Sequence, residues 1–261
     1  MRKIAKEILL RLHLLEPARR ARRFLYVYSG LRRLHCEWHT IRQNKLTEPE
    51  IEAIYDALYH GKSGYGSSHI PEGSGWRSDE DVKRAHAKAL LEAWPMKKIL
   101  VGGCSTGMGV LALRELGADA WGFDIAPDLD DIVRSEVRAY VRRGTMTRMP
   151  FGPEDAFEAL VTTDVLEHVQ VRHLGEMFAE LRRLGFRRMA HLINHTQISP
   201  DHMTLKPISW WERRMRAHGF ALRKDIRTKV SDDKRIYGLN GDPEHVYTFW
   251  ERDFTNHTDG L

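Results

Sequence analysis

The chain has 261 residues, of which 42% are hydrophobic, and it carries a formal net charge of +5 at neutral pH. This length and content are enough for one large α/β domain with an extension. No apolar run is long enough to predict a signal peptide or a membrane span, and the two cysteines, Cys36 and Cys104, lack the spacing of a disulfide framework or a zinc cluster. We therefore expect a cytoplasmic protein with free thiols.

Positive charge is concentrated at the N-terminus. Residues 1–45 hold 12 Lys and Arg against 3 Glu, so the rest of the chain sums to −4. Apolar residues recur there at helical spacing among the basic ones, which predicts two basic amphipathic helices, one around Ile4 to Leu15 and one from about Ala18 to Trp38. Such helices dock on an anionic membrane surface, bind nucleic acid or pack as a cap on a domain, and the sequence leaves these alternatives open.

A glycine- and serine-rich loop, residues 61–76, follows a predicted helix from Glu48 to Tyr59. Its aromatic residues Tyr65 and Trp76 are compatible with a lid over a ligand and equally with a linker. The next predicted helix runs from Asp79 to Trp94, with Ser78 as its N-cap. We therefore divide the chain into a basic helical extension with a lid loop, residues 1–78, and a single α/β domain, residues 79–261.

The segment from Lys97 to Gly109 combines a short buried strand with a glycine-rich turn, and a helix is predicted after it from Val110 to Leu116. Glycines allow a tight turn and the close approach of a ligand, while the unpaired N–H groups of a helix N-terminus attract a carboxylate or a phosphate. In the dinucleotide-binding fingerprint the first glycine of the motif directly follows the strand. Here Gly107 comes four residues after Gly103, which disfavours that fingerprint.

Two later segments place acidic groups at strand ends. A second strand is predicted from Ala120 to Asp124, whose carboxylate can accept two hydrogen bonds from a ribose diol. A third buried run, Leu160 to Val169, has the polar end D-V-L-E-H-V. In this order the glycine turn, Asp124 and the D-x-L-E-H-V segment resemble class I S-adenosylmethionine (SAM) dependent methyltransferases. The resemblance implies an α/β fold with a Rossmann-like, seven-stranded methyltransferase sheet, a helical N-terminal extension and a ligand crevice at the carboxyl ends of the strands.

The same resemblance implies SAM as the cofactor and assigns residues to it. The three glycine positions of the family's turn correspond to Gly103, Ser105 and Gly107, so a serine replaces the middle glycine. The acidic residue at the end of the second strand corresponds to Asp124, the ribose ligand. The remaining cofactor contacts that the resemblance implies are Ile125 after the second strand, Thr145 and Met146 at the adenine, and Thr163. This threonine lies in the Leu160–Val169 run, which corresponds to the fourth strand of the family's sheet.

Further elements follow from apolar periodicity and from glycine or capping signals. We predict helices from Pro127 to Arg143 and from Gln170 to Leu184, a fifth strand from Phe186 to His195, a helix that begins at a Ser209–Glu212 capping box and ends at Gly219, and last strands from Phe220 to Ile226 and from His245 to Trp250.

Methyl transfer to a neutral hydroxyl needs a group that accepts the hydroxyl proton, and histidine is the usual choice. His168, His195 and His202 all follow the ends of predicted strands and are the candidate catalytic residues, whereas His191 lies inside a strand and is predicted to belong to the core. The segment Lys206–Trp211, K-P-I-S-W-W, resembles bacterial methyltransferases of glycan and antibiotic-sugar clusters. The predicted function is therefore O-methylation of a sugar hydroxyl, as in polysaccharide biosynthesis.

Asp164, Glu167 and His168 also resemble the acid-x-x-Glu-His pattern of methyltransferases that hold Mg²⁺ against a vicinal diol. A metal site and a metal-free site are both compatible with the sequence, so Mg²⁺ is an alternative second cofactor. Two other functions stay open. One is a nucleic-acid methyltransferase that uses the basic N-terminus, which we rank below the sugar enzyme, and the other is a non-catalytic binding module.

Overall fold

The computed structural model describes residues 30–47, 49–51, 53–54, 80–230 and 245–253. The helix predicted around Ile4 to Leu15, the loop 61–76 and the Ser78 cap lie outside these residues. So does most of the helix predicted from Glu48 to Tyr59, of which residues 49–51, 53 and 54 are helical. Among the described residues, no helix has the length and apolar character that crossing a membrane requires.

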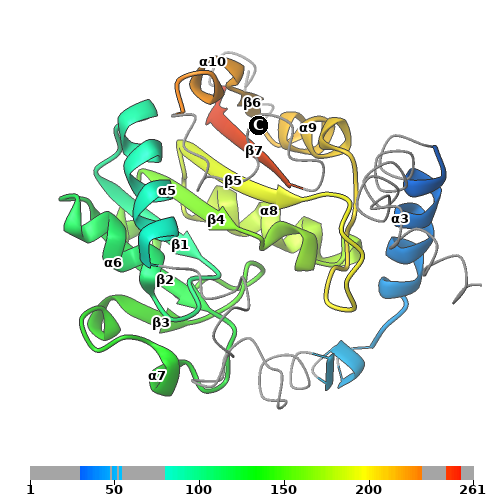
Figure 1. The fold of residues 1–261 in the computed structure, drawn as a ribbon, viewed down its shortest axis with the longest axis horizontal. Coiled ribbons are helices and arrows are strands. Elements are labelled where there is room, and N and C mark those ends of the chain that lie inside the picture. The colour runs from blue at the N-terminus through cyan, green and yellow to red at the C-terminus, as the bar shows by residue number, and fades with distance from the viewer. Residues whose placement is uncertain (1–29, 48, 52, 55–79, 231–244, 254–261) are drawn as a thin grey trace, which may run out of the picture.

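One sheet of seven strands forms the centre of the fold, in the order β3-β2-β1-β4-β5-β7-β6 (Figure 1). The first five strands of the chain pair in parallel, while β7 is antiparallel to both β5 and β6. This is the Rossmann-like seven-stranded sheet that the sequence predicted. The strands are β1 (Lys98–Gly102), β2 (Asp119–Asp124), β3 (Val141–Arg143), β4 (Ala159–Thr163), β5 (Arg188–Asn194), β6 (Phe220–Leu222) and β7 (His245–Arg252).

Helices cover both faces of the sheet. One buried cluster of apolar side chains joins the sheet to α5 (Glu80–Ala93), α6 (Met108–Glu115), α7 (Leu129–Ile132) and α10 (Lys224–Arg227). A second cluster joins the other face to α8 (Leu174–Arg183) and α9 (Ile208–Ala217). The helix α3 (Gly30–Gln43) stands apart at the edge of the molecule, beside the chain that connects β5 to α9 (Figure 1).

The central strands β1 and β4 are largely apolar because each is buried on both faces. In β1, Ile99 and Val101 belong to the first cluster and Leu100 to the second. In β4, Val161 and Leu160 divide in the same way. Successive side chains of a strand point to opposite faces, so a continuous aliphatic run fills both layers at once and the polar residues are left for the strand ends.

The helix predicted from Pro127 to Arg143 is wrong. The structure has the four-residue helix α7, a 3-10 turn at Arg138–Tyr140, and then the edge strand β3. Val133, Val137 and Val141 repeat at helical spacing, but the backbone is already extended at Val133, with ψ of 133°. Pairing of β3 with β2 overrides the periodicity, because Val and Tyr favour a strand once a partner edge is available.

Two smaller predictions near the C-terminus are also corrected. The helix α9 begins at Ile208 with Pro207 as its N-cap and has no side-chain cap, so Ser209 and Glu212 do not form the predicted capping box. Proline suits this position because its fixed φ matches the entry to the helix. The strand predicted from Phe220 to Ile226 stops at Leu222 and is followed by the short helix α10.

Candidate active site at the carboxyl ends of the strands

The glycine turn after β1 has the backbone shape that the sequence predicted. Gly103 and Gly107 have φ of 65° and 81°, in the left-handed region that side chains disfavour. A Cβ at Gly103 would lie 2.4 Å from a methyl carbon of Val165, and a Cβ at Gly107 would lie 2.7 Å from one of Val137. Both positions therefore require glycine on two independent grounds, and the turn leads directly into α6.

Asp124, at the end of β2, holds this turn in place. One carboxylate oxygen accepts a hydrogen bond from the Ser105 backbone N–H at 2.8 Å, and the other accepts one from the Ala126 N–H at 2.9 Å. Burial raises the pKa of this carboxyl group, and the two amide hydrogen bonds oppose that shift. A carboxylate offers about four acceptor positions, so the two amides leave capacity for a ribose diol.

The other predicted cofactor contacts lie at the same end of the sheet with different exposure. Ile125 is 52% exposed, whereas Met146 is buried. The Met146 sulfur packs closely on Gly102, since it would lie only 3.2 Å from a Cβ added to that glycine. The Thr145 hydroxyl shares a 3.0 Å hydrogen bond with that of Thr147, in the turn after β3. Thr163 is half-buried at the last position of β4.

A second group of polar side chains lies beyond β4 and β5. One ligand atom each from Glu167, His168 and His202 lies within 4.8 Å of the others, and we call these three residues the histidine–glutamate cluster. Glu167 and His168 belong to a 3-10 turn that follows β4, and His202 belongs to the loop between β5 and α9. The structure thus brings together two of the three predicted catalytic histidines, His168 and His202.

Glu167 is fully buried and connects the two halves of the cluster. Its backbone carbonyl accepts hydrogen bonds from the N–H groups of Met203 and Thr204, at 2.7 and 2.8 Å, and thereby fixes the His202 loop. One side-chain oxygen, Oε1, accepts the Asn194 N–H at 3.0 Å, whereas Oε2 is buried without a hydrogen-bond partner. Burial, together with the nearby Asp164, raises the pKa of Glu167 well above its usual value.

The two histidines of the cluster are each oriented by a backbone carbonyl. His168 Nδ1 donates to the Asp201 carbonyl at 2.9 Å, and His202 Nδ1 donates to the Gln197 carbonyl at 2.7 Å. The rings meet nearly at right angles, with centroids 5.0 Å apart. Burial and the neighbouring His202 lower the pKa of His168 to about 4, so His168 is neutral at physiological pH.

His195 and Asp164 take other positions. His195 lies directly after β5 and is half-buried, but it is not part of the histidine–glutamate cluster. Asp164 adopts a left-handed backbone conformation, with φ of 53°, and its Oδ1 lies 3.7 Å from His245 Nε2 at the start of β7. The sequence predicted that Asp164, Glu167 and His168 form a metal site. Within the described residues, the three that come together as potential ligands are Glu167, His168 and His202.

Four residues of this region were not predicted from the sequence as functional. Asn194 and Asp201 orient Glu167 and His168, His245 lies near Asp164, and His39 of α3 donates to the His202 carbonyl at 2.9 Å. Asn194 and His245 lie at strand ends on the same edge of the sheet, which is the one signal that could have found them. His39 has no such signal, because its contact depends on how α3 packs.

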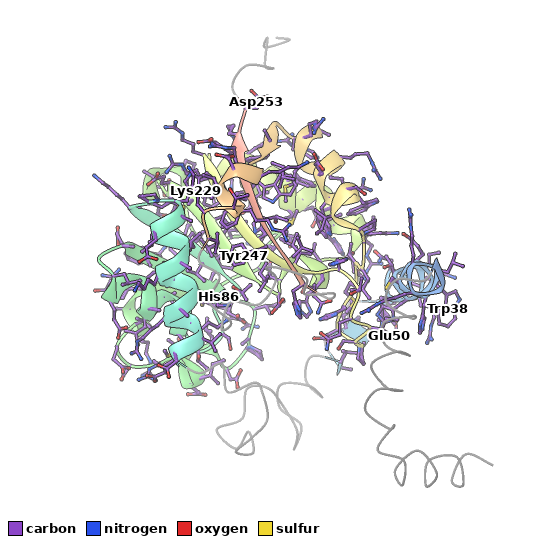
Figure 2. All side chains as sticks on the ribbon, turned by 45° about the horizontal axis from the view of Figure 1, so that its top comes forward. Trp38, Glu50, His86, Lys229, Tyr247 and Asp253 are labelled. Carbon is purple, nitrogen blue, oxygen red and sulfur yellow. The ribbon has the colours of Figure 1, made fainter. Side chains whose placement is uncertain are left out.

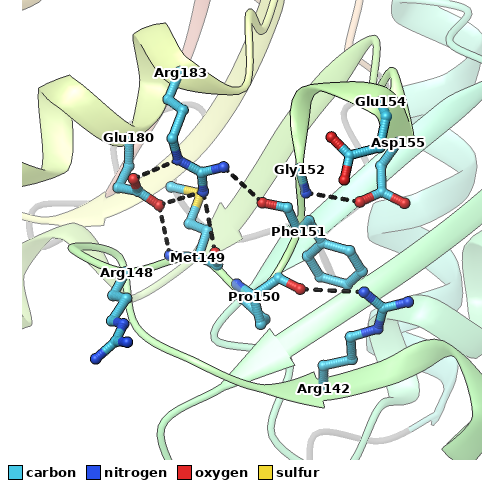
Figure 3. A pocket seen from close by; sticks show the side chains of 10 residues that line it. All are labelled: Arg142, Arg148, Met149, Pro150, Phe151, Gly152, Glu154, Asp155, Glu180 and Arg183. Atoms are coloured by element: carbon cyan, nitrogen blue, oxygen red, sulfur yellow. Dashed lines mark hydrogen bonds and ion pairs between the residues drawn. The ribbon is translucent and has the colours of Figure 1, made fainter.

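A hollow of about 650 Å³ lies between α8 and the chain after β3, and Figure 3 shows the residues that line it. Two of its arginines are engaged within the protein: Arg142 donates to the Pro150 carbonyl, and Arg183 binds the Glu180 carboxylate and the Phe151 carbonyl. The lining includes none of the predicted site residues. We therefore place the candidate active site at the glycine turn and the histidine–glutamate cluster.

Comparison with known proteins finds one matching family model and several structures with the same fold. Residues 100–186 match a family model described as a methyltransferase domain, and this segment contains the glycine turn, Asp124, Glu167 and His168. The same fold occurs in the 1,6-didemethyltoxoflavin-N1-methyltransferase of Burkholderia thailandensis, solved with S-adenosylhomocysteine (SAH). That structure matches at 12% identity with a TM-score of 0.53, over 80% of this chain and 91% of the other.

A second match is the magnesium protoporphyrin IX methyltransferase of Synechocystis PCC 6803 with bound SAM, at 13% identity and a TM-score of 0.53, over 78% of this chain and 97% of the other. No curated protein sequence matches. Identities this low establish the fold alone, and the family model covers about a third of the chain.

Proposed function

We propose that this protein is a class I SAM-dependent methyltransferase that transfers a methyl group to a sugar hydroxyl of a glycan, a glycolipid or a glycosylated metabolite. The observation that carries the proposal is the placement of two different sites on one edge of the sheet. Asp124 and the glycine turn lie at the ends of β1 and β2, and the histidine–glutamate cluster lies beyond β4 and β5.

The spacing of the strands supports a donor side and an acceptor side. A single strand, β1, separates β2 from β4, so their ends are about 10 Å apart. A ligand held by its ribose at Asp124 can therefore extend along the edge and present its far end towards the cluster. SAM supplies an already activated methyl group, so the main tasks of the protein are to align the acceptor and to receive its proton.

The cluster supports an oxygen acceptor. A neutral hydroxyl loses its proton as the C–O bond forms, and the cluster holds a carboxyl group and two imidazoles, which are groups that can assist the loss of that proton. The resemblance of the segment Lys206–Trp211 to sugar methyltransferases supports a sugar as the carrier of the hydroxyl. In the structure Trp211 is buried in the core, while Trp210 is half-buried and stacks on Arg214 at 3.7 Å.

Isothermal titration calorimetry with SAH and with NAD tests the cofactor. We expect SAH to bind and NAD not to bind. Asp124→Asn keeps the shape of the side chain but removes its charge, so it should weaken SAH binding by about 1.5–3 kcal/mol. The matched control is Asp130→Ala, an exposed acid close by on α7, which should leave SAH affinity unchanged. Binding of NAD without SAH would contradict the proposal.

The acceptor side is tested with His168→Ala and a panel of free and lipid-linked sugars as substrates. We expect turnover to fall by about 10²- to 10⁴-fold, because the variant removes a group that assists only as the proton leaves. SAH affinity should stay the same, since the cofactor residues lie at other strands. Methylation of an amine or a carbon atom, with every sugar inactive, would leave a SAM enzyme but overturn the sugar assignment.

We further propose that the acceptor is met at an anionic membrane surface. The outer side of α3 exposes Leu34, Trp38 and Ile41 by 67%, 55% and 56%, in one stripe at helical spacing, and we call these residues the α3 stripe. Arg33 and Arg42 are exposed beside it. Figure 2 shows Trp38 at the outer edge of the molecule. Apolar side chains flanked by arginine match the chemistry of an anionic lipid interface.

A further inference from the structure

Glu167 Oε2 is the atom in the candidate site that most needs an explanation. The side chain is 0% exposed, and this oxygen has no hydrogen-bond partner, although Oε1 is satisfied by the Asn194 N–H. A buried carboxylate oxygen without a partner is costly, and a native protein retains such a group where an ion or a ligand completes it. Glu167 belongs to the same small group as His168 and His202, in which one ligand atom of each residue lies within 4.8 Å of the others.

Both imidazoles are held in the manner of metal ligands. Metal-binding histidines commonly donate one ring N–H to a backbone carbonyl, which fixes the tautomer and turns the other nitrogen towards the ion. His202 Nδ1 donates to the Gln197 carbonyl and His168 Nδ1 donates to the Asp201 carbonyl, so in each neutral ring the lone pair belongs to Nε2. The His202 carbonyl is in turn held by His39.

We infer that Glu167, His168 and His202 bind a divalent transition-metal ion, such as Mn²⁺, Fe²⁺, Co²⁺ or Zn²⁺. Two imidazole nitrogens and one carboxylate suit these ions, and three protein ligands leave coordination positions open. Mg²⁺ and Ca²⁺ are disfavoured, because both prefer sites built from oxygen ligands. Ligand atoms around a zinc ion stand about 3.4 Å apart, so small side-chain movements would close the observed spacing.

The site is positioned by rigid parts of the fold on two sides. The 3-10 turn that carries Glu167 and His168 is joined to the His202 loop by the hydrogen bonds of Met203 and Thr204 to the Glu167 carbonyl. Behind that loop, His39 of α3 and Asn44 in the turn after α3 bind the carbonyls of His202 and Met203. The side chain of His168 is 18% exposed, so part of the cluster is accessible to solvent.

The catalytic role of this metal ion rests on the proposed function. A metal ion at the cluster would bind the acceptor hydroxyl and lower its pKa, so that its proton leaves to water. The resulting alkoxide oxygen forms the new C–O bond while the C–S bond of the donor breaks. Its electron pair stays on sulfur, which becomes a neutral thioether.

The test is metal binding by the full-length, tag-free protein after treatment with a chelator. We expect one equivalent of Co²⁺ to give the visible absorption bands of a protein-bound ion and Zn²⁺ to displace it, while Mg²⁺ alone produces no heat in calorimetry. Glu167→Gln and His202→Ala should each weaken Co²⁺ binding by more than about 100-fold, which exceeds the loss from an outer-shell partner.

A matched control is available on the surface. His173 and Glu176 form an exposed pair at 3.3 Å, and His173→Ala with Glu176→Gln removes the same chemical groups without changing the cluster. This variant should bind Co²⁺ like the wild type. If Glu167→Gln does not fold, as judged by circular dichroism, His202→Ala and His168→Ala carry the test. No binding by the folded wild type, or binding that survives these variants, would overturn the inference.

SAH titration of the same metal-free samples separates the two proposals. SAH binding without Co²⁺ binding leaves the methyltransferase proposal standing and removes the metal site. Co²⁺ binding that depends on the cluster, in a protein that does not bind SAH, confirms the metal site and overturns the proposed function.

Discussion

Ser105 stands where the family turn usually has a glycine, and its backbone adopts φ of 48°, in the left-handed region. For a residue with a side chain this conformation costs about 1–2 kcal/mol. What Ser105 contributes to the turn is its backbone N–H, which donates to Asp124. The serine side chain is therefore not what holds the turn together.

The variant Ser105→Gly should raise the free energy of unfolding by up to about 1 kcal/mol, because relief of strain exceeds the extra chain entropy of glycine. SAH affinity should change by less than twofold, and urea denaturation with calorimetry measures both. Ala156→Gly is the matched control, since Ala156 has φ of 51° in a turn away from the site. A loss of SAH binding in Ser105→Gly alone would show that the hydroxyl itself contacts the cofactor.

His191 is the buried histidine of β5, as predicted, and it makes stability depend on pH. Its Nδ1 shares a 2.8 Å hydrogen bond with the Thr162 hydroxyl, and burial lowers its pKa to about 3. The unfolded chain therefore binds more protons between pH 6.5 and about 3. The stabilising contribution is complete above pH 6.5 and is lost as the pH falls through this window.

Urea unfolding at pH 7.5, 6, 5 and 4.5 should show His191→Gln with a shallower loss of stability than the wild type. The difference in slope should approach about 1.4 kcal/mol per pH unit, the value for one proton. His168 has a lowered pKa and contributes a slope of the same sign, so the comparison with the variant isolates His191. Equal slopes would show that His191 does not titrate differently in the two states.

At the scale of single residues, the sequence predicted the positions that belong to a short motif. The positions of Gly103, Gly107 and Asp124 follow from a motif whose geometry is local, and the structure bears out their backbone arrangement. The partner of Glu167 could not be predicted, because it is the backbone N–H of Asn194, 27 residues along the chain. The contact of His202 with the Gln197 carbonyl, five residues away, depends on the conformation of the loop. Periodicity and motifs do not report such contacts.

At the scale of elements, the main error was the helix predicted between Pro127 and Arg143. Val133 and Val137 are apolar at helical spacing because they pack under the glycine turn and α6, and not because they share a helix face. The stretch ends in β3, where the Gly144 N–H donates to the Asp124 carbonyl. Sequence periodicity reports burial, and here a loop and an edge strand produced the same burial as a helix.

Asn44, in the turn directly after α3, supports the His202 loop. The Asn44 side chain donates to the Met203 carbonyl at 2.8 Å and accepts the Val171 N–H at 2.7 Å. Asn44→Ala leaves both groups without this partner, so the free energy of unfolding should fall by about 1–3 kcal/mol. Turnover should fall as well, while SAH affinity is kept, because Asp124 lies on the other side of the sheet centre.

Lys45→Ala is the control for Asn44→Ala, because it changes an exposed neighbour in the same turn after α3. It should alter neither stability nor turnover. Equal losses of SAH affinity and turnover in Asn44→Ala would indicate a global defect and contradict a specific role for α3 at the cluster.

At the scale of the whole molecule, the fold class was predictable and the position of α3 was not. Alternating strands and helices implied a doubly wound sheet, and the resemblance to methyltransferases implied its seven strands. The sequence described the basic N-terminus only as a membrane-binding element, a nucleic-acid-binding element or a cap. The structure shows that α3 packs on the His202 loop through Thr40 and His39 while it leaves the α3 stripe exposed.

This arrangement predicts that the protein binds anionic vesicles through the α3 stripe. Co-sedimentation should show binding to vesicles that contain phosphatidylglycerol and little binding to pure phosphatidylcholine, with binding reduced by salt. Replacing Leu34, Trp38 and Ile41 together with serine should abolish it, because each buried apolar side chain contributes about 1.5–3 kcal/mol. Leu116→Ser is the matched control, since Leu116 is 48% exposed on a different face.

Three outcomes would contradict the membrane proposal. Vesicle binding that survives the triple serine variant would show that another surface makes the contact. Protection of the α3 stripe from solvent in the free protein, measured by hydrogen exchange and Trp38 fluorescence quenching, would indicate that residues 1–29 of the same chain cover it. Binding of RNA without vesicle binding, with an affinity that falls steeply as salt rises, would favour a nucleic-acid substrate, because phosphate contacts release counterions.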